Sequence, residues 1–422
     1  MFRAFRHRNY RLFFAGQSIS LIGTWVRQTA LGWLVYRLTD SPLMLGVVVF
    51  CSQIPTFLIA PFAGVLADKW NRHHLLIICQ ILSMMQALIL TYLVLAGHIE
   101  IWQIITLAII LGIVNSFDIP VRQTFTFDMV ENTHDLGNAI ALNSSMFNAA
   151  RLIGASLAGI LIVRWGEGIC FLINGLTYLP VIAALLAMKI KAQHHLKAKH
   201  PPVLKELKEG IVYAWKFPPI RTILLFHALI SLMGMPYAVT LPIFARDILE
   251  SGPRVLGFLM GASGLGALIG AIFLASRKNV RGLGKIIVWA TAVFGLGLIT
   301  FSFSSILWIS LPLMVFTGFG MLVETVSTNT VLQSIVDDDK RGRVMSFYTM
   351  AFMGMAPLGS LMAGSLASKI GAPHTLILGG VCCLLGSLLF ARELPELRKL
   401  IHPIYIRKGI IPQPSTEVQI GT

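Results

Sequence analysis

The chain has 422 residues, of which 55% are hydrophobic and 13% are charged, and its formal net charge is +15. A soluble domain carries about 25% charged residues, so this composition excludes a soluble globular protein. The positive charge raises nucleic acid as a partner, and the positions of the charges along the chain decide that question.

Twelve segments are apolar and long enough to cross a bilayer core, which takes about 20 residues of helix. They predict an all-α membrane protein with twelve transmembrane helices. Six segments precede a basic, proline-containing stretch near residue 200 and six follow it. They cover residues 11–36, 43–66, 75–96, 101–121, 138–163, 169–189, 220–246, 255–276, 284–304, 306–333, 344–368 and 373–391.

Lysine and arginine lie mainly on one side of these segments. The amino terminus, the loop after each even-numbered segment and the carboxy tail hold 27 of the 34, and the opposite loops hold five. This asymmetry follows the positive-inside rule, so both termini are expected in the cytoplasm and no nucleic-acid partner is predicted. The five cysteines lie in or beside apolar segments without metal-ligand spacing, so no metal or cofactor is expected.

The first segment carries a polar stripe. Gln17, Ser20, Thr24 and Gln28 follow one another at i, i+3, i+7 and i+11, and Arg27 lies beside them. That spacing places the four on one face of a helix. We expect this face to meet a cavity or another helix rather than lipid.

The loop between the second and third segments, Gly64–His74, places one acid among several cations. It resembles the signature loop of major facilitator superfamily transporters, G-x-L-A-D-[RK]-x-G-R-[RK], with Asn71 in place of the second glycine. The resemblance implies that Asp68 engages the amino end of helix 11, where exposed amides favour an anion, and stabilises the state closed to the cytoplasm. The residues assigned to this conformational switch are Gly64, Asp68, Lys69 and Arg72.

Four ionisable side chains fall at membrane depth, where a charge costs roughly 2.5–3.5 kcal/mol on insertion scales and is usually functional. We expect Asp118 to pair with Arg151 or with the nearby Arg122. Glu324 has no obvious partner in its own half, and an acid in a low-dielectric cavity can take up a proton near neutrality. Glu324 is therefore the first candidate for proton coupling and Asp118 the second, and static pairs that hold helices together are the alternative. The four charges are Arg27, Asp118, Arg151 and Glu324.

The chain matches itself at about half its length. Ile19–Gly23 recurs as Ile230–Gly234 at an offset of 211, and Asp118 corresponds to Glu324 at an offset of 206. Ordered matches predict two pseudo-symmetric six-helix halves in parallel topology, with substrate between them near the midplane. The predicted division is an N-terminal bundle at 1–190, a basic cytoplasmic linker at 191–219, a C-terminal bundle at 220–392 and a cytoplasmic tail at 393–422.

Polar side chains on the expected cavity-lining helices are the candidate substrate contacts. They are Gln17, Thr24, Gln28, Asn115, Asn148, Tyr237 and Thr317. The spans are also rich in phenylalanine and methionine, a lining that suits bulky amphipathic molecules.

Segments outside the loop narrow the resemblance. Asn9–Gln17, Phe117–Gln123 and Asn138–Asn143 are similar to the drug:proton antiporter-3 group, which includes macrolide efflux proteins and the enterobactin exporter. The resemblance implies a secondary transporter in a bacterial inner membrane that exports amphipathic small molecules, drugs or siderophores, in exchange for protons. The chain departs from related antiporters at Gly154-Ala155, where they carry Gly-Pro. We expect it to act as a monomer.

Other function classes have less support. An ATP-driven pump needs G-x-x-x-x-G-K-[ST], and the one Gly-Lys pair, Gly284-Lys285, is followed by Ile. The chain contains no H-E-x-x-H motif and no convincing histidine cluster, so an enzyme is not expected. A lysophospholipid or other metabolite transporter of the same fold stays open, as does a non-transporting membrane sensor.

Overall fold

The computed structural model describes residues 3–67, 70–130, 133–188, 213, 215–277, 279–337 and 340–408, and the regular structure within those ranges is helical. The first half of the chain holds η1 (Arg3–Arg6), α1 (Arg8–Thr39), α2 (Pro42–Ala67), α3 (Arg72–Leu95), α4 (Ile101–Met129) and α5 (Thr133–Ala187). The second half holds α7 (Pro218–Met233), α8 (Tyr237–Ile243), η2 (Phe244–Ile248), α9 (Pro253–Ala275), α10 (Leu283–Ser302), α11 (Leu307–Ile335), α12 (Arg341–Ile370) and α13 (Ala372–Arg407).

Ten helices in the described part of the chain are long and apolar enough to cross a membrane. The longest, in α5, is two crossings, because its ladder is interrupted at Gly166, whose φ of 78° favours glycine. The 32-residue α1 adds another. The described helices therefore accommodate the twelve predicted spans, with α7 and α8 counted as one.

The seventh span is broken rather than continuous. α7 ends at Met233, and α8 begins at Tyr237, directly after Pro236. The helix is interrupted here because a proline lacks the amide hydrogen that would continue the helical hydrogen bonds. A five-residue π-helix, η2, follows α8 directly. A π-turn changes the direction in which side chains project, and here it presents Arg246 and Asp247 to the end of α1.

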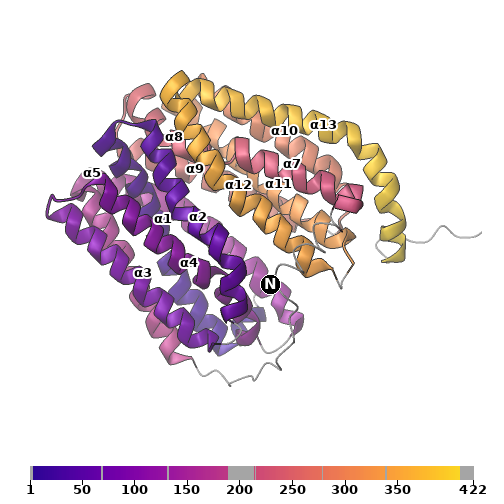
Figure 1. Ribbon diagram of the computed structural model, residues 1–422, viewed down its shortest axis with the longest axis horizontal. Helices are drawn as coiled ribbons and strands as arrows, with labels where there is room; N and C mark the ends of the chain where they lie inside the picture. The colour runs from indigo at the N-terminus through magenta and orange to yellow at the C-terminus, as the bar shows by residue number, and fades with distance from the viewer. Residues whose placement is uncertain are drawn as a thin grey trace, which may run out of the picture.

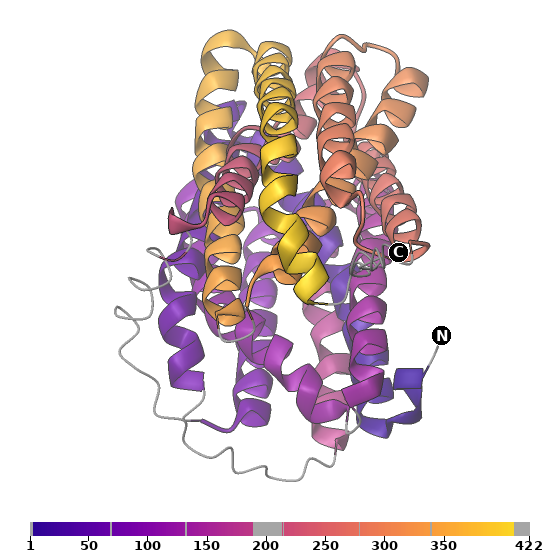
Figure 2. The same ribbon diagram turned by 90° about the vertical axis from the view of Figure 1, so that its right-hand side faces the viewer.

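The two halves form separate bundles in both views of the ribbon (Figures 1 and 2). We call the end of the molecule where α1 ends and α2 begins the outer end, and the end where α1 begins the inner end. The bundles lie together near α8 and separate toward the inner end (Figure 1). The proposed linker, residues 191–212 above all, lies outside the described residues, so its boundaries stay a prediction.

Small residues hold the halves together at the outer end. A Cβ on Gly46 of α2 would lie 2.5 Å from the Ser360 carbonyl oxygen of α12, and one on Gly257 of α9 would lie 2.6 Å from the Ala155 carbonyl oxygen of α5. Membrane helices use such glycines because two backbones can then approach closely. The two glycine contacts therefore join α2 to α12 and α5 to α9 where the bundles converge.

The last helix is longer than predicted. The apolar segment ends near residue 391, but α13 continues to Arg407 through Pro395 and Pro403. Thirty-six residues of helix measure about 54 Å, well beyond the roughly 30 Å of a bilayer core. The excess curves along the edge of the second bundle (Figure 1).

Candidate transport site

Arg151 joins the two halves at mid-depth. It lies near the middle of the first arm of α5, and its Nη2 donates to the Tyr237 hydroxyl at 2.8 Å and to the Ser263 hydroxyl at 2.9 Å. The two hydroxyls share a hydrogen bond of 2.6 Å with each other. The Arg151 guanidinium also lies 5.3 Å from the Trp25 ring centroid, a favourable cation–π geometry.

Of the two partners expected for Asp118, the structure shows Arg122 and not Arg151. Gln80 donates to one Asp118 oxygen at 2.7 Å, and Arg122 approaches the other at 3.1 Å, so the alternative partner is the one observed. Asp118 and Arg122 are one helical turn apart on α4, which places them side by side. Arg151 is thereby left to neutral hydroxyls and an indole from three other helices, and its Nε has no partner among the described residues.

Glu324 has a partner that the sequence analysis missed. Its Oε1 lies 3.1 Å from Nδ1 of His227 on α7, and both side chains are fully buried. Thr328 donates to the same oxygen and Thr325 to the other, each at 3.1 Å. The expectation that Glu324 has no partner in its own half is therefore wrong, because its partner comes from α7 of the same half.

Aromatic rings cover the histidine. Tyr348 and Phe352, one turn apart on α12, stack against the His227 ring with centroid distances of 4.6 Å and 5.7 Å. The Tyr348 hydroxyl donates to the Thr325 carbonyl oxygen at 3.0 Å. Nε2 of His227 is buried without a hydrogen-bond partner in the described residues. His227 and Glu324 are therefore hydrogen-bonded to each other and shielded from solvent.

The stripe on α1 is only partly buried. Gln17 is buried and its Oε1 has no partner among the described residues. Thr24 donates to the Ser20 carbonyl oxygen of its own helix at 3.0 Å, and Gln28 is exposed. Arg27 is half-buried, and its Nε likewise has no partner in the part described.

The remaining candidates fall into two groups. Asn115 is half-buried on α4, and Asn148 is buried on α5, where its amide donates to the Ser144 carbonyl oxygen at 2.9 Å. Thr317 is fully buried and donates to Leu313 within α11. A Cβ on Gly297 of α10 would lie 2.6 Å from the Thr317 hydroxyl. Thr317 therefore packs inside the second bundle, between α10 and α11, and does not face the first.

A polar cluster closes the outer end. The Tyr36 hydroxyl of α1 donates to Asp247 of η2, and Arg246 of η2 pairs with Asp40. The Arg246 guanidinium also lies 5.4 Å from the Tyr36 ring centroid. We call these four residues the outer cluster. It joins the end of the first span to the end of the seventh.

The signature loop is described at its second end only. Asp68 and Lys69 lie outside the described residues, and Gly64 falls in the last turns of α2, where side-chain surroundings are not described. Arg72 opens α3, and Asn71 caps that helix by accepting from the His73 and His74 amides. The replacement of the motif's second glycine by Asn71 thus supplies a favoured N-cap residue.

Comparisons with known proteins agree over 90% or more of the chain. A family model described as transmembrane secretion effector matches residues 1–404. The staphyloferrin A transporter of Staphylococcus aureus is 27% identical over 386 residues, 90% of this chain and 95% of the relative. The multidrug efflux pump Tap of Mycolicibacterium fortuitum is 24% identical over 92% and 94% of the two chains. Macrolide efflux protein A of Streptococcus pyogenes is 21% identical over 94% and 99%.

Solved structures share the fold at low identity. The nucleoside transporter NupG superposes with a TM-score of 0.68 at 12% identity, over 92% of this chain and 99% of that one. A bacterial homologue of the iron transporter ferroportin, in an inward-facing state, gives 0.66 at 18% identity over 91% and 98%.

Proposed function

We propose that the protein exports amphipathic small molecules in exchange for protons. The chain belongs to the transmembrane secretion effector family of major facilitator transporters. The chain is a multi-pass membrane protein and a secondary transporter of small molecules. The transporters that it resembles match it over nearly their whole length. The family consists of transporters rather than enzymes. The proposal adds the coupling ion and the residues that bind it.

The buried pair of His227 and Glu324 is the observation that carries the proposal. Both side chains are completely enclosed by α7, α11 and α12. Removing a proton from the pair changes its net charge where no water can solvate it, and an unbalanced buried charge is costly. The transporter lowers this cost by opening the pair to water, and that opening is the coupled conformational step.

The pair has a direct route to the other half. His227 lies on α7, ten residues before Tyr237, and the break after Met233 separates the two. Tyr237 holds Arg151 of the first bundle. A change in the bond between His227 and Glu324 shifts α7, and the shift reaches Arg151 through Tyr237.

The substrate class follows from the arginines. Neither Arg27 nor Arg151 forms an ion pair with a carboxylate of the described residues, and both lie on spans of the first bundle that face the second. Two cations without acidic partners favour substrates that carry an acidic group beside an apolar body. Gln17, Thr24, Gln28, Asn115, Asn148 and Tyr237 are the proposed polar contacts around them.

Orientation and assembly complete the proposal. We place both termini in the cytoplasm of a bacterium, with the protein acting as a monomer in the inner membrane, on the asymmetry of its lysines and arginines. The outer end is then periplasmic, and the conformation is the one that opens inward. Asp68, with Gly64, Lys69 and Arg72, forms the cytoplasmic switch, and Asp68→Asn slows transport with substrate affinity nearly unchanged.

Proteoliposomes under an imposed pH gradient test the coupling. Carboxyfluorescein serves as the anionic probe and ethidium as the cationic one. We expect Glu324→Gln to lose gradient-driven movement of the transported dye while it still binds the dye. Glu250→Gln, an exposed acid at the outer end, is the matched control and should retain activity. Normal gradient-driven transport by Glu324→Gln would overturn the assignment.

A further inference from the structure

The inner third of α13 lies over the inner end of the second bundle. Its far end is tied to the end of α11 by three contacts. Arg407 pairs with Asp337 at 2.7 Å, Tyr405 shares a 3.1 Å hydrogen bond with Ser334, and the Lys408 ammonium donates to the Val336 carbonyl oxygen at 2.5 Å. Between these ties and the transmembrane part of α13, Leu397 is buried against the bundle, and Leu394 and Ile401 pack beside it.

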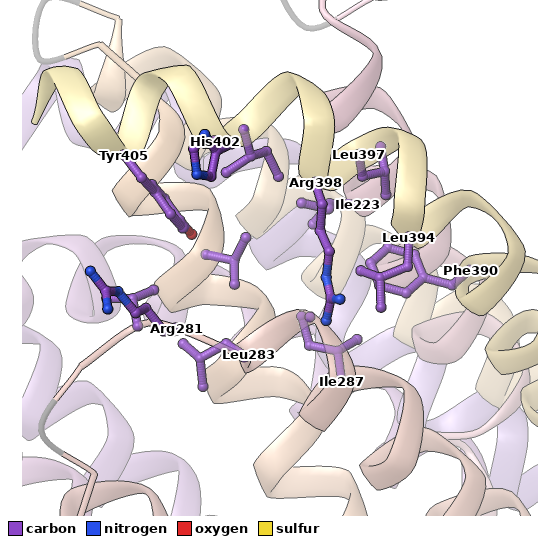
Figure 3. A pocket seen from close by; sticks show the side chains of 15 residues that line it. Ile223, Arg281, Leu283, Ile287, Phe390, Leu394, Leu397, Arg398, His402 and Tyr405 are labelled. Carbon is purple, nitrogen blue, oxygen red and sulfur yellow. The ribbon is translucent and has the colours of Figure 1, made fainter. Parts of the chain in front are cut away.

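A cavity of about 240 Å³ lies between this part of α13 and the second bundle. Its walls come from α7, the first turns of α10, the loop before α10, α11 and one face of α13 (Figure 3). The α13 face runs from Phe390 to Tyr405, sixteen residues and about 22 Å of helix. The cavity is therefore long and narrow, and it is smaller than the roughly 300–1,000 Å³ of a drug-sized site.

The walls are apolar in their middle. Ile223, Leu283 and Ile287 lie on the bundle side, and Leu394 and Leu397 lie on the α13 side (Figure 3). Val331 of α11 is also part of the lining. No polar group in this stretch calls for a polar ligand. A slender apolar chain suits such walls.

Basic side chains mark the rest of the lining. Arg281, Arg398 and His402 belong to it, and in Figure 3 Arg398 extends from α13 across the cavity toward Ile287. Arg398 forms no ion pair with a described carboxylate, whereas the acid nearest in sequence, Glu396, pairs with Lys399. No acidic side chain is among the lining residues. The site thus pairs an apolar slot with an uncompensated guanidinium.

We propose that this groove binds one anionic phospholipid, with an acyl chain in the apolar slot and the phosphate at Arg398. Arginine matches phosphate geometry through two parallel hydrogen bonds. The groove lies at the inner end, where lysine and arginine are concentrated and where the proposed orientation puts the anionic cytoplasmic leaflet. Half of a bilayer core is about 15 Å thick, so 22 Å of groove accommodates a chain and its headgroup. This site is separate from the transport path between the halves, and it holds whether or not protons are the coupling ion.

Thermal unfolding of the full-length protein in detergent tests the proposal. A ligand that binds only the folded state raises the melting temperature. We expect phosphatidylglycerol to raise it by several degrees more than phosphatidylcholine. Arg398→Ala should lose most of that difference, while Arg392→Ala, which removes the same charge from an exposed position of the same helix outside the groove, should keep it. Equal shifts with the two lipids, the same shift with inorganic phosphate, or equal losses in the two variants would overturn the proposal.

Native mass spectrometry provides a second readout that does not depend on stability. Leu394→Trp fills the apolar slot, so the variant should retain at least threefold less co-purified phosphatidylglycerol than the unmodified chain. An unchanged lipid count in a folded Leu394→Trp protein would count against the groove as the binding site.

Discussion

The hydroxyl of Tyr237 accepts a 2.8 Å hydrogen bond from the guanidinium of Arg151, across the boundary between the two halves of the molecule. The donor is charged and both side chains lie at mid-depth, so this contact is stronger than an exposed hydrogen bond. It joins the interior of α5 to the start of α8, and it makes the boundary sensitive to either partner.

Tyr237→Phe removes this acceptor and leaves Arg151 with Ser263. Loss of one hydrogen bond to a charged group costs about 1.5–3 kcal/mol, so the state in which the outer end is closed should lose tenfold or more of its population. Labelling of a cysteine introduced at the outer end would report the shift. Tyr92→Phe, on an exposed ring, should label like the parent protein, and an unaltered rate in Tyr237→Phe would show that the bridge is not part of the closed state.

His227 and Glu324 should behave as one unit. We expect His227→Asn and Glu324→Gln each to lose gradient-driven transport, and the double variant to be no worse than either alone, because residues in contact are not additive. Transport rates of the four proteins in one set of proteoliposomes give the coupling. Additive losses would mean that the two side chains act separately, and full activity of His227→Asn would remove the histidine from the mechanism.

Closure of the outer end depends on backbone approach. Gly46→Val places a branched side chain where a Cβ alone would lie 2.5 Å from the Ser360 carbonyl oxygen, so α2 and α12 must separate. Transport should fall at least tenfold, with the outer end held open to labelling reagents. Gly137→Val is the control, since a Cβ at Gly137 meets nothing within 4 Å. Equal activity of the two variants would contradict this account.

The ion pair of Arg246 and Asp40 should contribute less to transport than the buried contacts described above. Both side chains are substantially exposed, at 40% and 69%, and exposed pairs are worth about 0–1 kcal/mol. Asp40→Asn should therefore change transport no more than about fivefold, with a smaller effect at high salt because salt screens exposed charges. A tenfold loss that persists in 1 M salt would show that the pair does more than its exposure allows.

Much of the architecture could be predicted because apolar length is a local property. The twelve spans, the two halves and the family resemblance all came from such patterns, and the family and fold comparisons confirm the class and the resemblance. The end of α13 was missed because the apolar run ends near residue 391 and charged residues follow it. Leu397 and Tyr405 nevertheless pack on the bundle and continue the apolar face of the helix.

The candidate site was harder to predict because its contacts are long-range. His227 lies in an apolar run that gives no local sign of its role, and its partner Glu324 is 97 positions away. Arg151 was expected to seek an acid in its own half. Two hydroxyls and an indole contact its guanidinium instead, and no local spacing in the sequence predicts such a set. The one signal available was that a histidine lies in a membrane span, because ionisable groups at that depth usually have a function.

The break before α8 leaves a short rod of seven residues, about 10 Å long, between two contacts. Tyr237 at its start holds Arg151, and η2 directly after its end holds the outer cluster. A rigid rod this short cannot turn at one end and stay still at the other. Release of Arg151 and opening of the outer end are therefore expected to be a single cooperative event, and the transition between the two access states should follow one exponential phase at every substrate concentration.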